Sequence, residues 1–174
     1  WAASHPSIAY TTNCKGKGPA WANSLFEDNA EYGYGMFLGV RQIREKLYEL
    51  MEETLKTNID ANVKEAFSEW MKEWINGERT REVSSRVMDC LKNYQMGSNA
   101  LIDQILLRKD YLVKQSHWLI GGDGWAYDIG YGGLDHVLAM GDDVNILVLD
   151  TEIYSNTGGQ SSKSTPLGAV AKFA

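Results

Sequence analysis

The spacing of apolar residues predicts that the first two thirds of the chain are mainly helical. Between about residues 24 and 57, apolar side chains recur at steps of mostly three, four and five residues, and charged side chains occupy the positions between them. This pattern is typical of an amphipathic helix that packs one stripe against a core. The predicted stripe consists of Met36, Val40, Ile43, Leu47, Leu50 and Leu55, and the charged face includes Arg41, Arg44, Glu45, Lys46, Glu49, Glu52 and Glu53.

Three further helices are predicted after this one. The second has Asp60 as a candidate N-cap and Gly77 as a candidate C-terminal stop. The third runs from about residue 79 to 94, and a short fourth covers residues 101–107. The apolar stripes of the second and third helices are formed by Val63, Phe67, Trp70 and Trp74 and by Val83, Val87 and Leu91.

The pattern changes in the last third of the chain. Short apolar runs at residues 116–120 and 145–149 predict two strands, and residues 125–139 between them follow a helical pattern. Strand, glycine turn, helix and strand make a βαβ unit, and strands this apolar are usually buried on both faces of a parallel sheet. We expect Gly130, Gly132 and Gly133 to let the connecting helix pack closely against a neighbour. Residues 1–22 are predicted to be loops, and residues 167–174 to begin another helix.

Composition and charge narrow the function classes. The 174 residues, 44% of them hydrophobic, can form one globular domain with a real core. The net charge of −6, without a Lys/Arg block, argues against binding to nucleic acid or to an anionic membrane. No apolar stretch reaches the roughly 20 residues that cross a bilayer. Cys14 and Cys90 are too far apart to suggest a disulfide framework or a zinc site. Because the chain starts at Trp1 and ends within a predicted helix, we expect a fragment of a larger protein.

Two polar, glycine-containing loops follow the two predicted strands. The first spans residues 121–125 (GGDGW) and the second residues 150–159 (DTEIYSNTGG). Ligands of open parallel sheets bind beyond the carboxyl ends of the strands, so neighbouring strands would bring these loops to one crevice. Glycines before a helix also let the backbone approach a phosphate closely.

Several phosphate motifs compete for these loops. The dinucleotide fingerprint requires glycine where Tyr127 stands, and the nucleotide P-loop requires glycine before Lys163, where Ser162 stands. A magnesium site accounts for Asp123, because Mg²⁺ takes one or two carboxylates together with substrate phosphates. The hydroxyl of Thr151 and a carbonyl of the same loop would add neutral ligands. An aspartate at a helix start is also often only a cap, and that alternative stays open.

Three long segments of the sequence resemble pyruvate:ferredoxin (flavodoxin) oxidoreductases. They are residues 121–133 (GGDGWAYDIGYGG), residues 149–174 (LDTEIYSNTGGQSSKSTPLGAVAKFA) and residues 16–36 (GKGPAWANSLFEDNAEYGYGM). The resemblance extends over nearly the whole chain and implies an α/β fold, namely part of the doubly wound thiamine diphosphate-binding domain. The helical segment at about residues 24–110 and the βαβ unit at about residues 115–174 would then both lie in a fragment of that C-terminal domain.

The resemblance also implies roles for individual residues. Magnesium would be held by Asp123, by Thr151 and by the carbonyl of Ile153. Asn156 would approach the reacting centre and contact substrate. The diphosphate of thiamine pyrophosphate would be lined by Gly122, Asp123, Gly124 and Trp125 and by Thr151, Glu152, Ile153, Tyr154, Ser155 and Asn156.

The reaction implied is the oxidative decarboxylation of pyruvate with coenzyme A to acetyl-CoA and CO₂, with electrons passed through iron–sulfur clusters to ferredoxin or flavodoxin. Two distant cysteines cannot ligate a [4Fe–4S] cluster, so the clusters would belong to other domains and the segment alone would be inactive. The resemblance further implies a homodimer, in the cytoplasm or in an organelle of an anaerobic protist. The alternatives are another 2-oxoacid:ferredoxin oxidoreductase and a nucleotide-binding module without catalysis.

Overall fold

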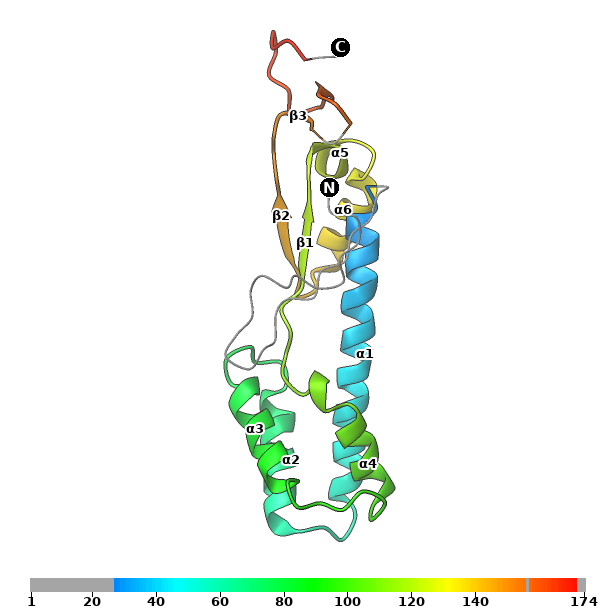
Figure 1. The fold of residues 1–174 in the computed structure, drawn as a ribbon, viewed down its shortest axis with the longest axis vertical. Coiled ribbons are helices and arrows are strands. Elements are labelled where there is room, and N and C mark those ends of the chain that lie inside the picture. The colour runs from blue at the N-terminus through cyan, green and yellow to red at the C-terminus, as the bar shows by residue number, and fades with distance from the viewer. Residues whose placement is uncertain (1–26, 156, 172–174) are drawn as a thin grey trace. The chain divides into compact units, whose positions relative to one another are not determined.

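The computed structural model describes residues 27–155 and 157–171, which fall into two units (Figure 1). Residues 27–35 and 117–171 belong to one unit, which we call the α/β unit, and residues 36–116 form the other, which we call the helical unit. The first helix, α1 (Asn29–Leu55), begins in the α/β unit and continues in the helical unit. None of the described helices combines the length and the apolar character that a bilayer span requires.

The helical unit has its own apolar core. Besides α1 it contains α2 (Ala61–Glu73), α3 (Thr80–Cys90), α4 (Ala100–Leu107) and the 3₁₀ helix η1 (Lys109–Tyr111), and α2 lies beside α3 (Figure 1). Burial of the core side chains removes apolar surface from water and supplies most of the stability of the unit. The core consists of Leu47, Leu50, Met51, Val63, Ala66, Phe67, Trp70, Val83, Val87, Leu91, Ile102, Ile105 and Leu112.

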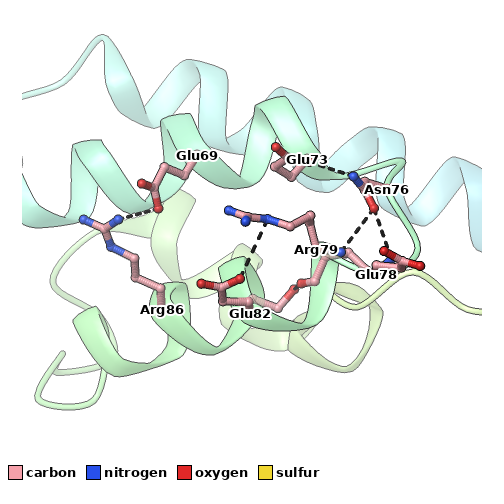
Figure 2. Close-up of polar contacts among 9 residues, drawn as sticks. Glu69, Glu73, Asn76, Glu78, Arg79, Glu82 and Arg86 are labelled. Carbon is pink, nitrogen blue, oxygen red and sulfur yellow. Dashed lines mark hydrogen bonds and ion pairs between the residues drawn. The ribbon is translucent and has the colours of Figure 1, made fainter.

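Polar contacts join α2 and α3 at the surface (Figure 2). Arg86 on α3 pairs with Glu69 on α2 and lies 3.0 Å from a carboxylate oxygen of Glu65. In the turn between the helices, the Asn76 side-chain oxygen accepts hydrogen bonds from the backbone N–H groups of Glu78 and Arg79, both at 3.1 Å. Because these groups are exposed, the ion pairs contribute little compared with the core.

The ends of the second helix test the predicted capping residues. Asp60 is the N-cap, as predicted, and its carboxylate accepts a hydrogen bond of 2.8 Å from the backbone N–H of Asn62. The prediction that Gly77 ends the helix is wrong. The helix ends at Glu73, and Gly77 does not adopt the left-handed conformation that makes glycine a helix stop.

Arg44 corrects the predicted charged face of α1, because it is only 5% exposed. Its guanidinium donates hydrogen bonds to the carbonyls of Tyr111 (2.5 Å), Leu112 (2.7 Å) and Trp74. It also lies 5.5 Å from the ring centroid of Trp70. Burial lowers the pKa of Arg44 to about 10, so the group stays charged at neutral pH. The buried stripe therefore includes a cation that binds carbonyls rather than a carboxylate.

The α/β unit contains the predicted βαβ arrangement. The strands β1 (Trp118–Gly121) and β2 (Asn145–Val148) are parallel, with Trp118 opposite Asn145 and Gly121 opposite Val148. Two helices, α5 (Asp123–Tyr127) and α6 (Tyr131–Met140), connect them where one was predicted. A short antiparallel pair follows, β3 (Ile153–Tyr154) with β4 (Gln160–Ser161).

The break between α5 and α6 arises from a close backbone contact. The N–H of Gly130 donates to the carbonyl of Gly124 at 3.1 Å, and a Cβ at Gly130 would lie 2.7 Å from Trp125 Cα. A Cβ at Gly133 would overlap the carboxylate of Glu31, whereas one at Gly132 would meet nothing within 4 Å. The predicted close packing is therefore confirmed at Gly130 and Gly133 and wrong at Gly132.

Glycine also brings the first turns of α1 onto β1. A Cβ at Gly33 would lie 2.1 Å from a methyl carbon of Leu119, so the Leu119 side chain packs directly against the backbone of α1 at this point. The Asn29 side chain donates a hydrogen bond of 2.8 Å to the carbonyl of Ile120. Together these contacts position β1, and with it the loop that follows it.

Two predictions for this unit are wrong. The strands are not buried on both faces: Leu147 is 41% exposed and Trp118 58% exposed, because only two parallel strands pair within the described residues. Residues 167–171 are not helical and make a turn in which Ala169 N–H donates to the carbonyl of Pro166 at 3.0 Å. The left-handed φ of 84° at Gly168 is incompatible with a continuous right-handed helix.

Candidate functional site

The loops after β1 and β2 meet at the carboxyl ends of the two strands. The parallel register continues past the strands, since Leu149 N–H donates to the carbonyl of Gly121 at 2.8 Å. This places Asp123, the first residue of α5, beside Thr151. The Oδ1 atom of Asp123 accepts hydrogen bonds from the backbone N–H of Thr151 at 2.9 Å and from its hydroxyl at 3.1 Å. The two residues that the sequence analysis placed on facing loops therefore lie in direct contact.

The carboxylate of Asp123 is buried, and protein groups donate hydrogen bonds to both of its oxygens. It is only 2% exposed, and its second oxygen, Oδ2, accepts from the hydroxyls of Ser162 (2.8 Å) and Ser164 (2.6 Å). Burial alone raises the pKa of Asp123. Hydrogen bonds from Ser164, Thr151 and Ser162 outweigh that effect and hold the pKa below its usual value. The structure thus holds a charged carboxylate at neutral pH.

The oxygens of Asp123 and Ile153 that were predicted to bind magnesium both lie next to the Thr151 hydroxyl. The Thr151 hydroxyl oxygen lies 3.1 Å from Asp123 Oδ1 and 2.9 Å from the carbonyl oxygen of Ile153. Neighbouring ligands of an octahedral ion with bonds of about 2.1 Å are about 3.0 Å apart, which is √2 times the bond length. The Ser155 hydroxyl lies 3.1 Å from that of Thr151. The donor set is one carboxylate, hydroxyls and a carbonyl, and it fits a hard cation such as Mg²⁺.

The same chemistry argues against a soft or borderline metal. Zinc and iron–sulfur sites are built from cysteine and histidine, with acidic residues as additional ligands for zinc. No group of three or more His, Cys, Asp or Glu side chains is placed to hold an ion in the part of the chain that the structure describes. A metal at Asp123 would therefore depend on neutral oxygen ligands.

The other residues predicted to line a cofactor differ in their surroundings. A Cβ at Gly122 would meet only the Leu149 carbonyl oxygen, at 3.8 Å, so the chain leaves room on that side of its backbone. Gly124 instead accommodates the ring of Tyr154, 2.8 Å from where a Cβ would be. The side chain of Trp125 is fully buried, and its ring occupies the space beside Gly121. Of the two glycines, Gly122 could accept a Cβ at ordinary contact distance and Gly124 could not.

The second loop is held in shape by local hydrogen bonds. Glu152 has a left-handed φ of 63°, and its N–H donates to Asp150 Oδ1 at 3.0 Å.

Tyr154 is the titratable side chain of the second loop whose pKa is shifted most. Burial and a hydrogen bond to Asp128 raise the pKa of Tyr154 to about 12, so its hydroxyl remains protonated at neutral pH. Asn156, predicted to contact substrate, lies outside the described residues.

Two serines of the site were not identified from the sequence. Ser162 and Ser164 lie 39 and 41 residues from Asp123 and reach it because the segment after β4 turns back over the loops. The Ser164 hydroxyl oxygen also lies 3.0 Å from Asp150, a second acceptor for its hydrogen. Both serines lie within residues 149–174, one of the segments that resemble the oxidoreductases, but the resemblance gave them no role.

Comparison with known proteins gives relatives along the whole chain. No family model matches it. The chain is 55% identical over 174 residues to a pyruvate-flavodoxin oxidoreductase of Klebsiella pneumoniae and 52% identical over 178 residues to a pyruvate:ferredoxin oxidoreductase of Moorella thermoacetica, and it covers 15% of each. It is 47% identical over 209 residues to a pyruvate dehydrogenase [NADP(+)] of Cryptosporidium parvum, of which it covers 11%. The whole of the chain is matched in all three cases. The chain therefore belongs, as one segment, to the family of the pyruvate:ferredoxin and pyruvate-flavodoxin oxidoreductases.

Proposed function

We propose that this chain binds the diphosphate of thiamine pyrophosphate through Mg²⁺, as part of a pyruvate:ferredoxin or pyruvate-flavodoxin oxidoreductase. The observation that carries the proposal is the cluster of Asp123, Thr151 and Ile153 at the carboxyl ends of two parallel strands. Ligands of open α/β sheets bind at such ends, and Mg²⁺ is commonly shared between a carboxylate and phosphate oxygens.

Each residue has a defined task in this proposal. Asp123 supplies the single negative ligand, Thr151 and the Ile153 carbonyl supply neutral ones, and the remaining positions of the ion are left for phosphate oxygens and water. Because Gly122 has no side chain, a phosphate can approach its backbone closely. When bound, thiamine pyrophosphate supplies the chemistry that cleaves the bond between the carboxyl and carbonyl carbons of a 2-oxoacid. The chain contributes binding and orientation.

The names of the relatives support a role in the pyruvate part of the reaction. Those names share pyruvate but differ in the electron acceptor, which is flavodoxin, ferredoxin or NADP(+). A segment that is about equally similar to all three is better suited to the shared substrate chemistry than to the choice of acceptor. Pyruvate is accordingly the proposed substrate of the whole protein.

Other components of that reaction are proposed to lie on other parts of the polypeptide. The described residues include one cysteine, Cys90, and a cubane cluster takes several cysteine ligands, usually four. The iron–sulfur clusters, the contacts to ferredoxin or flavodoxin and the site for coenzyme A would be provided elsewhere in a homodimeric enzyme. We therefore expect the 174-residue segment alone to show no pyruvate-dependent reduction of a viologen dye.

Calorimetric titration of the intact protein with thiamine pyrophosphate, with and without Mg²⁺, tests the proposal. Loss of an outer-shell partner typically weakens metal binding by about 10- to 100-fold, so Asp123→Ala, which removes a ligand, should cost at least about 100-fold. Asp135→Ala on the exposed face of α6 is the matched control and should bind like the unmodified protein. Unchanged magnesium-dependent affinity in Asp123→Ala would refute the assignment.

A further inference from the structure

We propose that Ser162 and Ser164 form a serine clamp that makes the Asp123 site selective for Mg²⁺ over Ca²⁺. The inference rests on the proposed function, since it concerns the same ion. The clamp acts on one of the two carboxylate oxygens of Asp123 and thereby decides how that carboxylate can bind a metal.

The two oxygens of Asp123 have different partners. Oδ1 lies beside the Thr151 hydroxyl, at 3.1 Å, and so belongs to the three-oxygen cluster that the ion would occupy. Oδ2 lies 2.8 Å from the Ser162 hydroxyl and 2.6 Å from that of Ser164. Hydrogen bonds to a charged oxygen are among the strong ones in proteins. Oδ1 also accepts the backbone N–H of Thr151 at 2.9 Å, so each oxygen accepts two hydrogen bonds in this structure. When the Thr151 hydroxyl oxygen binds the ion, its hydrogen turns away and leaves one position on Oδ1 for the ion, whereas both positions on Oδ2 are taken by the serine hydroxyls.

This asymmetry discriminates between the two hard cations. Mg²⁺ requires near-ideal octahedral geometry with bonds of about 2.0–2.1 Å, and one carboxylate oxygen fills one position. Ca²⁺ takes six to eight oxygens at about 2.3–2.6 Å and often binds a carboxylate through both of its oxygens. By occupying Oδ2, the clamp removes the second oxygen that Ca²⁺ would use.

The clamp is itself fixed by the surrounding loops. The N–H of Ser162 donates to the Thr165 hydroxyl at 2.9 Å, and that hydroxyl donates to the carbonyl of Glu152 in the second loop. The N–H of Ser164 donates to the Ser162 hydroxyl oxygen at 3.2 Å, and the Ser164 hydroxyl oxygen lies 3.0 Å from Asp150, a second acceptor for its single hydrogen. These contacts hold the two serines against the loop that carries Thr151.

The test measures the affinities of the intact protein for Mg²⁺ and for Ca²⁺ by calorimetry, at saturating thiamine pyrophosphate. In Ser162→Ala/Ser164→Ala the ratio of Mg²⁺ to Ca²⁺ affinity should fall about tenfold or more, in line with the usual effect of removing outer-shell partners. Ser161→Ala is the matched control, because Ser161 is the exposed neighbour in β4 and makes no side-chain contact with Asp123. The control should keep the ratio of the unmodified protein.

Further variants separate the clamp from the metal site. Ser164→Thr keeps the hydroxyl and should restore most of the selectivity that Ser164→Ala loses, which a purely structural role would not predict. If the double variant fails to fold, the two single variants carry the same comparison. An unchanged affinity ratio in the alanine variants, with Asp123→Ala still abolishing binding, would overturn the clamp alone. Unchanged binding in Asp123→Ala would overturn the proposed function together with the clamp.

Discussion

The close approach at Gly130 allows a quantitative prediction with an internal control. In Gly130→Ala the new Cβ would lie 2.6 Å from the Glu27 carbonyl oxygen and 2.7 Å from both Cα and O of Trp125. All three are backbone atoms, so relief requires movement of the chain next to Asp123. Overpacking of this kind typically costs about 1–3 kcal/mol. Gly132, in the first turn of α6, is the control. In Gly132→Ala the new Cβ would meet nothing within 4 Å, and the change should stabilise α6 by about 0.5–1 kcal/mol.

The two variants should therefore differ by roughly 1.5–4 kcal/mol in local stability, with opposite signs relative to the unmodified protein. Native-state hydrogen exchange of the intact protein, read by mass spectrometry on peptides covering residues 123–140, measures this difference. The opening constants of the two variants should differ by roughly 10- to 700-fold, since about 1.4 kcal/mol is a factor of ten. Magnesium-dependent cofactor affinity should fall only in Gly130→Ala.

Undiminished protection from exchange in Gly130→Ala, equal to that in Gly132→Ala, would refute this prediction. That result would mean that the backbone around Gly130 yields easily, and that the break between α5 and α6 is not held by this contact. Equal loss of protection in both variants would instead indicate that any side chain on this face of α6 disrupts packing.

Three further predictions concern single side chains. Arg44→Met should destabilise the helical unit by about 2–4 kcal/mol in denaturant titrations followed by tryptophan fluorescence, because it removes the guanidinium that donates to the carbonyls of residues 74, 111 and 112. Exposed Arg79→Met should change the stability little. Asp60→Ala should cost about 1 kcal/mol in the same assay through the lost N-cap bond, and an equal stability would contradict the capping role. Tyr154 has a folded-state pKa of about 12, above the roughly 10 of an unfolded tyrosine, so its contribution to stability is complete below about pH 10 and is lost as the pH rises towards 12. In Tyr154→Phe that alkaline loss, and the matching late step in tyrosinate absorbance, should be absent.

Local sequence patterns predicted most of the helices and strands. The formation of such an element depends mainly on residues that are close to one another in the sequence. The cap at Asp60 is decided by a backbone N–H two residues away, and the stripe containing Phe67 and Trp70 by the helical repeat itself. The burial of Arg44 could not be predicted from such local patterns. Its burial depends on carbonyls at residues 74, 111 and 112, which a periodicity argument does not include.

The candidate site shows the same division. The two loops could be expected to meet, because parallel strands place their carboxyl ends at one edge, and Asp123 and Thr151 are in contact there. The serine clamp could not be expected, since it requires the chain after β4 to return 39 and 41 residues later to the same carboxylate. The exposure of the sheet could not be predicted either, because a strand has the same apolar sequence whether or not another element covers it.

The sequence alone therefore determined the helices, the order of the βαβ unit and the residue types able to bind a hard cation. The tertiary structure decided which carboxylate oxygen faces Thr151, which hydroxyls engage the other oxygen, and where the connecting helix breaks at Gly130. The physical reason is the separation along the chain between the residues that interact. Propensity, capping and periodicity are properties of adjacent residues, whereas hydrogen bonds to Asp123 and backbone contacts at Gly130 join segments that only the folded chain brings within a few ångströms.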